Sequence, residues 1–261
     1  MYNSFCFFVL HFKQIFFCQM KYSIIIPTLN EEKLLPELLK QINNPELRSK
    51  FDIEIIVSDG GSKDKTIELA LDSSDIIKVH TLHERQNIAG GRNAGAKYAS
   101  GEILIFINGD VLVPDIIDFF KYIESNFVNS KYLGMTCRVK VFPSEEILLD
   151  KLYHAGYNSY FRMLNSLGLG MGRGECQIVR KEVFVKVNGY NEKLAAGEDF
   201  DLFRRIRQLG KILYAKDIRV YESPRRFRKI GYKGVTWSWV KNGFSVLLKN
   251  KSISKEWEQV R

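Results

Sequence analysis

Short runs of β-branched and aliphatic residues alternate along the first 110 residues with segments of helical periodicity. Runs of this kind predict buried strands, and the alternation of strand and helix favours a parallel sheet with helices on both faces. We therefore expect an α/β fold built on a mainly parallel sheet flanked by helices. The four predicted strands cover residues 22–27, 52–59, 75–81 and 102–108.

Helical patterns connect these strands, and Asn30 stands where a cap is wanted before the helix predicted over 31–42. The later part of the chain continues in the same style. We expect a helix over 91–100 and another over 113–127, a strand over 132–141, a long amphipathic helix over 144–168, a strand-to-helix unit over 175–190 and a loop-to-helix unit over 197–210.

The domain organisation follows from the absence of any low-complexity or Pro/Gly-rich break. We expect one domain of two lobes over residues 20–222 and a basic C-terminal helical tail over 223–261. Residues 1–19 are rich in aromatic side chains, but His11 and Lys13 interrupt the run before it reaches the ~20 residues that a membrane span needs. We interpret this segment as a leader or a misread start outside the fold.

Charge is concentrated at the C-terminal end of the chain. Of the net charge of +9, residues 216–261 carry +8, with Arg225 and Arg226 in a basic cluster after Pro224. Arginine side chains match phosphate oxygens, so this cluster suits a donor diphosphate, a phosphorylated acceptor or an anionic membrane face, and equally a solvated basic surface. The segment 234–250 mixes Trp, Phe and Leu with Lys, as in a helix that lies in a membrane interface or packs on its own domain.

The four cysteines show no metal-binding spacing, which fits a reducing, cytoplasmic setting. We expect the protein to be cytoplasmic, with peripheral attachment to the inner face of the plasma membrane as the role of the tail.

Three polar loops follow the ends of predicted parallel strands, at residues 27–31, 58–62 and 108–110, and should gather at one edge of the sheet. In the second loop, Asp59 can accept hydrogen bonds from a flat heterocycle, because Gly60 and Gly61 let a ligand approach the backbone. The same segment also suits a helix-entry turn in which Asp59 or Ser62 is the cap.

Asn108, Gly109 and Asp110 end the fourth strand. A carboxylate at this position can hold Mg²⁺ or Mn²⁺ together with phosphate oxygens and so neutralise a diphosphate leaving group. Asn-Gly-Asp is also common in plain turns, so this motif alone does not decide between the two interpretations.

Glu198, Asp199 and Asp201 are clustered at a predicted helix start. The helix dipole stabilises acids there, which is a structural reason for all three. Three acids in four residues exceed what capping requires, and one of them can act as a general base toward a hydroxyl group.

Taken in order, the segments "SIIIPTLNEEKLLPELL", "EIIVSDGGSKDKT", "GRNAGAKYASGEILIFINGDV" and "GEDFDLFRRIRQLG" resemble the family 2 glycosyltransferases, which have the GT-A fold. The resemblance covers residues 21–215 and implies a nucleotide-binding half followed by an acceptor-binding half. It implies a nucleotide-sugar donor, UDP- or GDP-linked, an Mg²⁺ or Mn²⁺ cofactor, and a sugar or lipid-linked acceptor. The nucleotide-binding residues that it implies are Pro27, Thr28, Asn30, Glu31, Asp59, Gly60, Arg92 and Asn108.

The resemblance also implies that Asp110 is the metal ligand and that Glu198 and Asp199 are catalytic, with Asp199 as the base for direct, inverting displacement. Asn108 departs from the family pattern, because it stands where the first acid of the DXD motif is expected and brings no charge. No histidine follows His154 to serve as a further metal ligand, and Glu222 is the nearby acid that remains.

We therefore predict an inverting glycosyltransferase. The rival from another class is a catalytically silent nucleotide-binding or membrane-scaffold protein of the same fold, which Asn108 favours and the pair Asp110 and Asp199 disfavours. A sugar-nucleotide pyrophosphorylase would need a Gly-rich loop after the first strand, and a NAD enzyme a G-x-G-x-x-G motif; neither is present. Nucleic acid is not an expected partner, because such a protein would not need three acidic loops.

Overall fold

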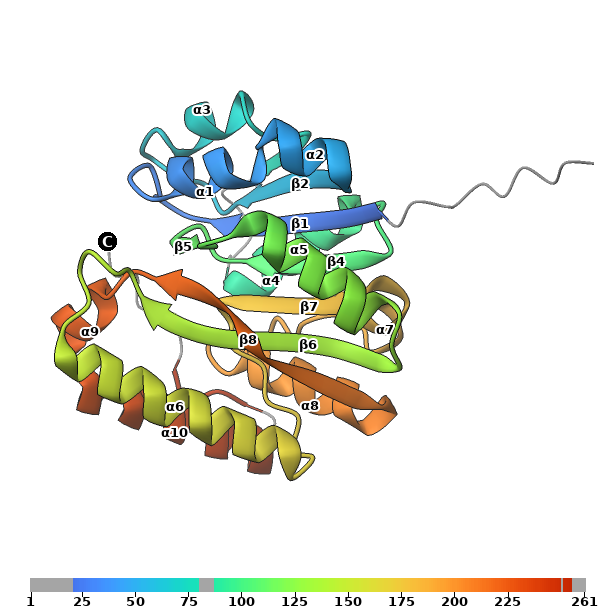
Figure 1. Cartoon of the computed structure of the whole chain (residues 1–261). Coiled ribbons are helices and arrows are strands. Elements are labelled where there is room, and N and C mark those ends of the chain that lie inside the picture. The colour runs from blue at the N-terminus through green and yellow to red at the C-terminus, as the bar shows by residue number, and fades with distance from the viewer. Residues whose placement is uncertain (1–20, 80–86, 250, 255–261) are drawn as a thin grey trace, which may run out of the picture.

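The computed structural model describes residues 21–79, 87–249 and 251–254 of the chain. Within them an eight-stranded sheet has the order β3-β2-β1-β4-β7-β6-β8-β5 (Figure 1). The strands are β1 (Lys21–Thr28), β2 (Asp52–Asp59), β3 (Ile76–Val79), β4 (Ile103–Ile107), β5 (Val111–Leu112), β6 (Tyr132–Val141), β7 (Cys176–Arg180) and β8 (Lys211–Glu222). The predicted segment 1–19 and the end of the strand predicted over 75–81 lie outside the described residues.

Helices cover both faces of this sheet, and a turn of π-helix (Glu124–Val128) extends α5. The helices α1, α2, α3 and α5 pack on one face, and α4, α7 and α8 pack on the other, each over its own hydrophobic core. The helices are α1 (Leu35–Ile42), α2 (Pro45–Lys50), α3 (Thr66–Leu71), α4 (Ile88–Tyr98), α5 (Ile116–Ile123), α6 (Leu148–Ser166), α7 (Lys181–Lys186), α8 (Glu198–Leu209), α9 (Arg225–Ile230) and α10 (Tyr232–Lys249).

The prediction of an α/β fold is confirmed, and parallel pairing joins the four N-terminal strands to one another and also joins β6 to β8. Strands β3, β2, β1 and β4 run parallel, whereas β7 is antiparallel to both β4 and β6, and β5 is antiparallel to β8. All five residues of β4 are buried, as the apolar run predicts for a central parallel strand.

Strand β8 was not predicted from the sequence. Its residues "KILYAKDIRVYE" mix charged and apolar side chains, and only two of the twelve are fully buried. The register against β6 also shifts between Cys137 and Arg138, so the usual alternation of a strand is broken. The pairing with β6 and β5, rather than local sequence pattern, makes this segment a strand.

The predicted helix cap at Asn30 is wrong. Helix α1 begins only at Leu35, with Leu34 at its N-cap. Asn30 has a left-handed backbone (φ 55°), its backbone N–H donates to Ser62 Oγ at 2.7 Å, and its side-chain Oδ1 accepts from the backbone N–H of Lys63 at 2.8 Å. Asn30 therefore joins the first and second polar loops instead of capping a helix.

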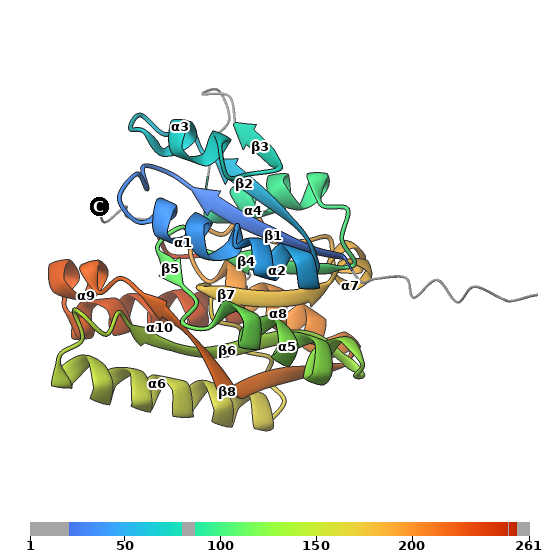
Figure 2. The ribbon, with the colours of Figure 1, turned by 45° about the horizontal axis from the view of Figure 1, so that its top comes forward.

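The C-terminal helices lie beside α6 at the far edge of the molecule (Figures 1 and 2). Tyr153 of α6 hydrogen-bonds Thr236 of α10 at 2.8 Å, and Tyr157 packs on Trp239 with 5.2 Å between ring centroids. The described part of the predicted tail is helical and packs on the rest of the protein, while Trp237 and Leu248 stay exposed. Among the described residues, no helix combines the length and apolar character required to cross a membrane.

Candidate active site

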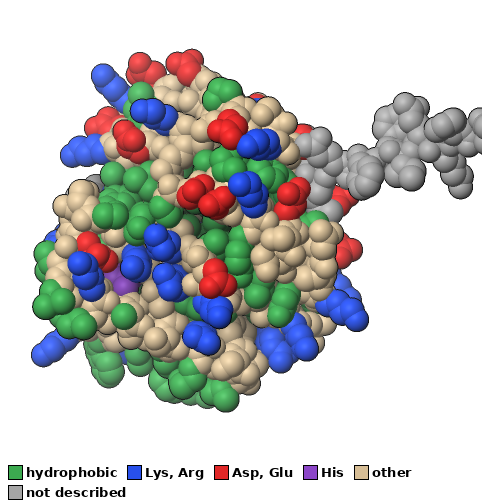
Figure 3. Space-filling view, viewed as in Figure 1, with side chains coloured by type: hydrophobic (Ala, Val, Ile, Leu, Met, Phe, Trp, Pro, Cys, Tyr) green, Lys and Arg blue, Asp and Glu red, His purple; other side chains and the backbone are tan. Residues whose placement is uncertain are grey.

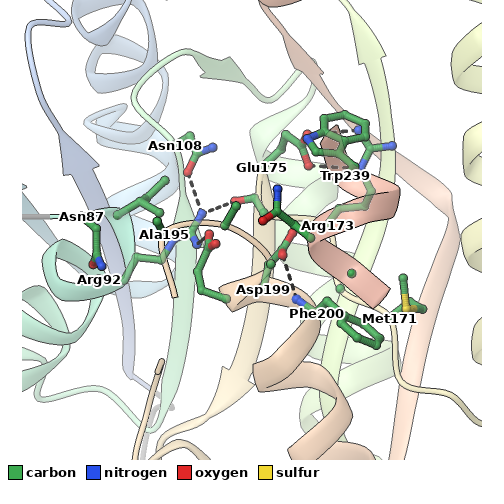
Figure 4. Close-up of a pocket in the computed structure, with 18 of the residues that line it drawn as sticks. Asn87, Arg92, Asn108, Met171, Arg173, Glu175, Ala195, Asp199, Phe200 and Trp239 are labelled. Atoms are coloured by element: carbon green, nitrogen blue, oxygen red, sulfur yellow. Dashed lines mark hydrogen bonds and ion pairs between the residues drawn. The ribbon is translucent and has the colours of Figure 1, made fainter. Parts of the chain in front are cut away.

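A cavity of about 1380 Å³ opens at the carboxyl ends of β1, β2 and β4, where the three polar loops meet the start of α8 and the end of β8 (Figure 4). The convergence of the loops is as predicted. The predicted site residues that line the cavity are Pro27, Thr28, Glu31, Gly60, Arg92, Asn108, Asp110, Glu198, Asp199, Arg225 and Arg226, whereas Asn30 and Asp59 do not line it.

Asp59 is fully buried and engaged by its own turn and by β1. Its Oδ1 accepts from the backbone N–H groups of Gly61 and Ser62 at 2.8 and 2.7 Å, and its Oδ2 accepts from the hydroxyl of Thr28 at 2.9 Å. The structure thus shows a turn closed by Asp59, but this turn does not cap the next helix, because α3 begins only at Thr66, with Lys65 at its N-cap and no side-chain cap. A contact between Asp59 and a nucleotide base stays a prediction and would require these bonds to rearrange.

Arg92 was expected near the nucleotide phosphates, and the structure engages its guanidinium group in three contacts inside the protein. Nη1 pairs with the Glu198 carboxylate at 2.9 Å, and Nη2 donates to Asn108 Oδ1 at 3.0 Å and to the carbonyl of Gly174 at 2.7 Å (Figure 4). Arg92 is only 1% exposed. It therefore connects the Asn108 loop to the acidic start of α8, and a phosphate contact stays a prediction.

Helix α4 can hold Arg92 there because it packs very close to the sheet. A Cβ atom on Gly95 would lie 2.6 Å from Cγ2 of Ile25, which is closer than carbon atoms can approach. The N-terminus of α4 is capped by Asn87, whose side chain accepts from the backbone N–H of Gly90 at 2.8 Å.

The orientation of Asn108 bears on metal binding. Its carbonyl oxygen, the amide atom that can ligate a hard cation, already accepts the hydrogen bond from Arg92. That bond occupies one of the two lone pairs of the oxygen, and the neutral amide brings no negative charge to a cation.

Asp110, the predicted metal ligand, pairs with Arg225 of α9. Arg225 Nη2 lies 2.9 Å from Asp110 Oδ2 and 2.7 Å from Glu31 Oε1, and Nη1 lies 3.0 Å from Glu31 Oε2. One guanidinium group thus pairs with two carboxylates from two different loops. Within the described ranges, no group of three or more His, Cys, Asp and Glu side chains is placed to hold a metal ion.

Glu222 ends β8 beside this pair, because β8 is paired with β5 and Glu222 is opposite Val111. Arg173 lies 3.4 Å from Glu222 and 3.1 Å from Glu175. Burial, followed by the charge of Glu175, raises the pKa of Glu222 well above its usual range. Burial therefore favours the protonated form of Glu222 more than it would for an exposed glutamate.

Asp199 is in the first turn of α8, after Gly197 in a left-handed conformation (φ 82°), and it lines the cavity (Figure 4). Its Oδ1 accepts from the backbone N–H of Phe200 at 2.7 Å. Burial, followed by the negative charge of Glu198, raises the pKa of Asp199 to about 7. A carboxylate with this pKa is suited to take a proton at neutral pH.

Glu198 was also predicted to be catalytic. Its ion pair with the buried Arg92 gives it a positioning role, since it holds the start of α8 against the Asn108 loop and adds negative charge next to Asp199.

Sequence reasoning missed one whole wall of the cavity. Apolar side chains from α6, from the loop after α6 and from α10 line its outer half, together with Arg173 and Glu175. The signal that was available is "LGLGMG" at residues 167–172, in which glycine alternates with large apolar residues.

The sequence profile described as "Glycosyl transferase family 2" matches residues 23–187, more than half of the chain. The chain belongs to glycosyltransferase family 2. Its relatives are named as glycosyltransferases, so the chain is an enzyme.

The chain is 27% identical over 233 residues to 4,4'-diaponeurosporenoate glycosyltransferase of Staphylococcus haemolyticus, covering 84% of this chain and 60% of the relative. It is 31% identical over 215 residues to the uncharacterized glycosyltransferase YfnE of Bacillus subtilis, covering 80% of this chain and 51% of that one. The family 2 chain thus spans between half and two thirds of the length of these relatives.

Solved structures confirm the GT-A-type fold. The mannosyltransferase PcManGT from Pyrobaculum calidifontis, solved with GDP-Man and Mn²⁺, aligns with a TM-score of 0.62 at 19% identity, over 84% of this chain and 60% of that one. Glucosyl-3-phosphoglycerate synthase from Mycobacterium tuberculosis, solved with Mn²⁺, UDP and phosphoglyceric acid, aligns with a TM-score of 0.59 at 18% identity, over 88% of this chain and 78% of that one.

Proposed function

We propose that this family 2 glycosyltransferase is an inverting enzyme that moves a sugar from a UDP- or GDP-linked donor to an acceptor hydroxyl or lipid phosphate. Asp199 removes the proton from the acceptor oxygen, that oxygen bonds to the anomeric carbon, and the nucleoside diphosphate leaves from the opposite face. The observation that carries this proposal is a carboxylate whose pKa is raised to about 7, in one cavity with Asp110 and the strand-end loops.

The donor nucleotide is assigned to the strand-end side of the cavity. Pro27, Thr28 and Gly60 line it there, next to the amide of Asn108. Support for a nucleotide-sugar donor comes from the structural neighbours, which were solved with GDP-Man in one case and UDP in the other.

Asp110 fits a divalent cation as a single carboxylate ligand that shares the ion with the donor diphosphate, as Mg²⁺ is often bound. Its Oδ2 atom already faces a cationic group, Arg225, so the oxygen has a geometry that accepts positive charge. When bound, Mg²⁺ or Mn²⁺ would offset the charge that develops on the leaving diphosphate. Arg225 and Arg226 lie beside this position and are assigned to phosphate oxygens of donor or acceptor.

We assign the protein to the cytoplasmic side of a membrane as a peripheral enzyme, with division into a domain over 20–222 and a tail over 223–261. The support is the basic tail and its exposed apolar side chains, including Trp237 and Phe244. The printed names of relatives include an O-antigen chain rhamnosyltransferase and a dolichol-phosphate mannosyltransferase, which agrees with a role in polysaccharide or glycolipid synthesis.

The alternative, a catalytically silent protein of the same fold, is favoured by two observations. Asn108 stands where the family pattern has an acid, and Arg225 already forms ion pairs with Asp110 and Glu31. Calorimetric titration of the protein with UDP, GDP and their sugar conjugates, with and without Mn²⁺, separates the two. The proposal expects metal-dependent binding of one nucleotide, whereas no binding of any of them would support the silent protein.

A further inference from the structure

The outer half of the cavity is a groove lined mainly by apolar side chains of α6, of α10 and of the loop 167–172, with Arg204, Arg207 and Gln208 of α8 as its polar neighbours. We call it the α6–α10 groove. It begins beside Asp199 and Phe200 at the start of α8, so it is continuous with the candidate active site. Its walls include the apolar side chains of Phe161, Leu164, Leu169, Met171, Phe244 and Leu247.

The loop at 167–172 is built to present apolar side chains. Gly170 lies against α8 with a left-handed backbone (φ 71°), and a Cβ there would be 2.5 Å from Cβ of Arg207; a Cβ on Gly172 would be 2.5 Å from the ring of Phe203. The large residues that alternate with these glycines line the cavity, and Leu169 is 52% exposed. Exposing such side chains beside an active site stabilises nothing in the free protein, which indicates a ligand.

The inner end of the groove is polar and cationic. Arg173 is 3% exposed, lines the cavity and stacks near Tyr157 and Phe161 at 5.4 and 5.5 Å from their centroids. Its Nη1 atom is buried and has no hydrogen-bond partner among the described residues. A buried guanidinium nitrogen in this state is suited to an anionic or hydroxyl oxygen of a ligand head group.

The apolar surface continues from the groove to the outside of both helices. Figure 3 shows hydrophobic side chains along the lower edge of the molecule, where α6 and α10 lie in Figure 1. Trp237 and Leu248 of α10 are 62% and 79% exposed, and every charged residue of that helix is a lysine. Apolar side chains with positive charges between them complement a membrane surface that contains anionic lipid.

We propose that the α6–α10 groove binds the aliphatic chain of a membrane-lipid acceptor, whose polar head points to Arg173 and Asp199. This inference rests on the proposed function, because a lipid bound in the groove is an acceptor only if the protein transfers a sugar to it. Aromatic residues alone would also suit a sugar chain, but the walls at Leu164, Leu169, Met171 and Leu247 are not suited to hydroxyl groups, because they offer no hydrogen-bonding side chains.

The test is calorimetric titration of the full chain with decyl phosphate, kept below its micelle concentration, and with ethyl phosphate. Each methylene buried in the groove should tighten binding about fourfold, so decyl phosphate should bind at least about 100-fold more tightly. Leu169→Gln and Leu247→Gln should each weaken decyl phosphate binding about tenfold or more. Leu71→Gln on α3, equally apolar and 61% exposed but outside the groove, is the matched control and should change nothing.

Equal affinity for the two phosphates would overturn the proposal, and so would an equal loss in Leu71→Gln, which would indicate unspecific adsorption. Sedimentation of the same samples tests for another occupant. A dimer that dissociates in the Leu247→Gln variant and does not bind decyl phosphate would assign the groove to a second copy of the chain and overturn the proposal. Thermal unfolding of each variant establishes that it is folded. Titration with UDP and GDP is a separate readout, so failure of the proposed function and failure of the groove can be told apart.

Discussion

At the scale of single residues, the site depends on two buried arginines that organise acids from distant parts of the chain. Arg92 on α4 ties Glu198 to Asn108, and Arg173 lies between Glu175 and Glu222. Each arginine offsets part of the negative charge in a region of low dielectric, and the pKa values of Asp199 and Glu222 stay raised nevertheless. The raised pKa of the Asp199 carboxylate is thus a product of several neighbours.

Replacement of that carboxylate tests its role as a base. Asp199→Asn keeps the shape and the hydrogen bond from Phe200 but cannot accept the acceptor proton, so we expect transfer to fall at least about 10²-fold with donor binding unchanged. Initial rates and nucleotide titration measure the two effects. Asp118→Asn, on the exposed face of α5, is the matched control. Undiminished turnover in Asp199→Asn would remove this residue from the mechanism.

The pKa of Asp199 also predicts the pH dependence of the reaction. The base acts when deprotonated, so kcat/KM should rise with pH through about 7 and level off above it. Stability should follow the opposite course, since the folded state retains a proton that the unfolded chain loses, and unfolding becomes easier as pH rises from about 4 to about 7. A pH–rate profile that is flat between pH 5 and 9 would contradict this assignment.

At the scale of elements, two contacts between segments assemble the site: β5 against β8, and the loop 167–172 against α8. The first brings Glu222 and the start of α9 beside Asp110, so that Arg225 reaches both Asp110 and Glu31. The second depends on glycines that leave space for Phe203 and Arg207. Both contacts join segments that are far apart in the sequence.

Asp110, which the β5–β8 contact places beside Arg225, can be tested by the substitution Asp110→Asn. The amide cannot carry the charge that a divalent cation needs, so we expect the Mn²⁺-dependent part of nucleotide binding to disappear while metal-free binding remains. Titration with the preferred nucleotide, with and without Mn²⁺, measures this. Asp115→Asn, five residues along the chain at the N-cap of α5, keeps a capping side chain and is the control. Full metal dependence in Asp110→Asn would place the ligand elsewhere.

The loop–helix contact predicts opposite effects of two glycine substitutions. Gly170→Ala forces a Cβ into a left-handed position 2.7 Å from the carbonyl oxygen of Phe203 and should lower the free energy of unfolding by at least about 1 kcal/mol. Gly156→Ala, in the interior of α6 with nothing within 4 Å of the new methyl group, should raise it by about 0.5–1 kcal/mol. Denaturant unfolding measures both, and equal effects of the two would refute this account of the loop.

At the scale of the whole molecule, charge and exposed apolar surface are both concentrated in the C-terminal helices. We expect binding to vesicles with anionic lipid that weakens as salt is added, because part of the attraction is electrostatic. Trp237→Gln and Leu248→Gln should reduce it several-fold, and Leu71→Gln should not. Vesicle co-sedimentation is the measurement. Deleting the tail would be a poor test, because Val235 and Val246 of α10 are buried and their loss would expose the core.

The sequence by itself determined the family, the parallel half of the sheet and most of the residues that line the cavity. These are local properties: apolar runs such as "ILIFI" in β4 form strands wherever they are buried, and motif residues sit at strand ends because of chain order. The strand predicted over 132–141 is observed with the same bounds, as β6.

Only the tertiary structure decided which side chains meet. The partnership of Arg225 with Asp110 spans 115 residues and depends on β8, a strand whose half-buried residues show no strand pattern. The hydrogen bonds that enclose Asp59, the link from Arg92 to Glu198 and the apolar groove between α6 and α10 arise in the same way. Contacts of this kind depend on the packing of distant segments, and burial sets the charge state of Asp199, so no local pattern in the sequence contains them.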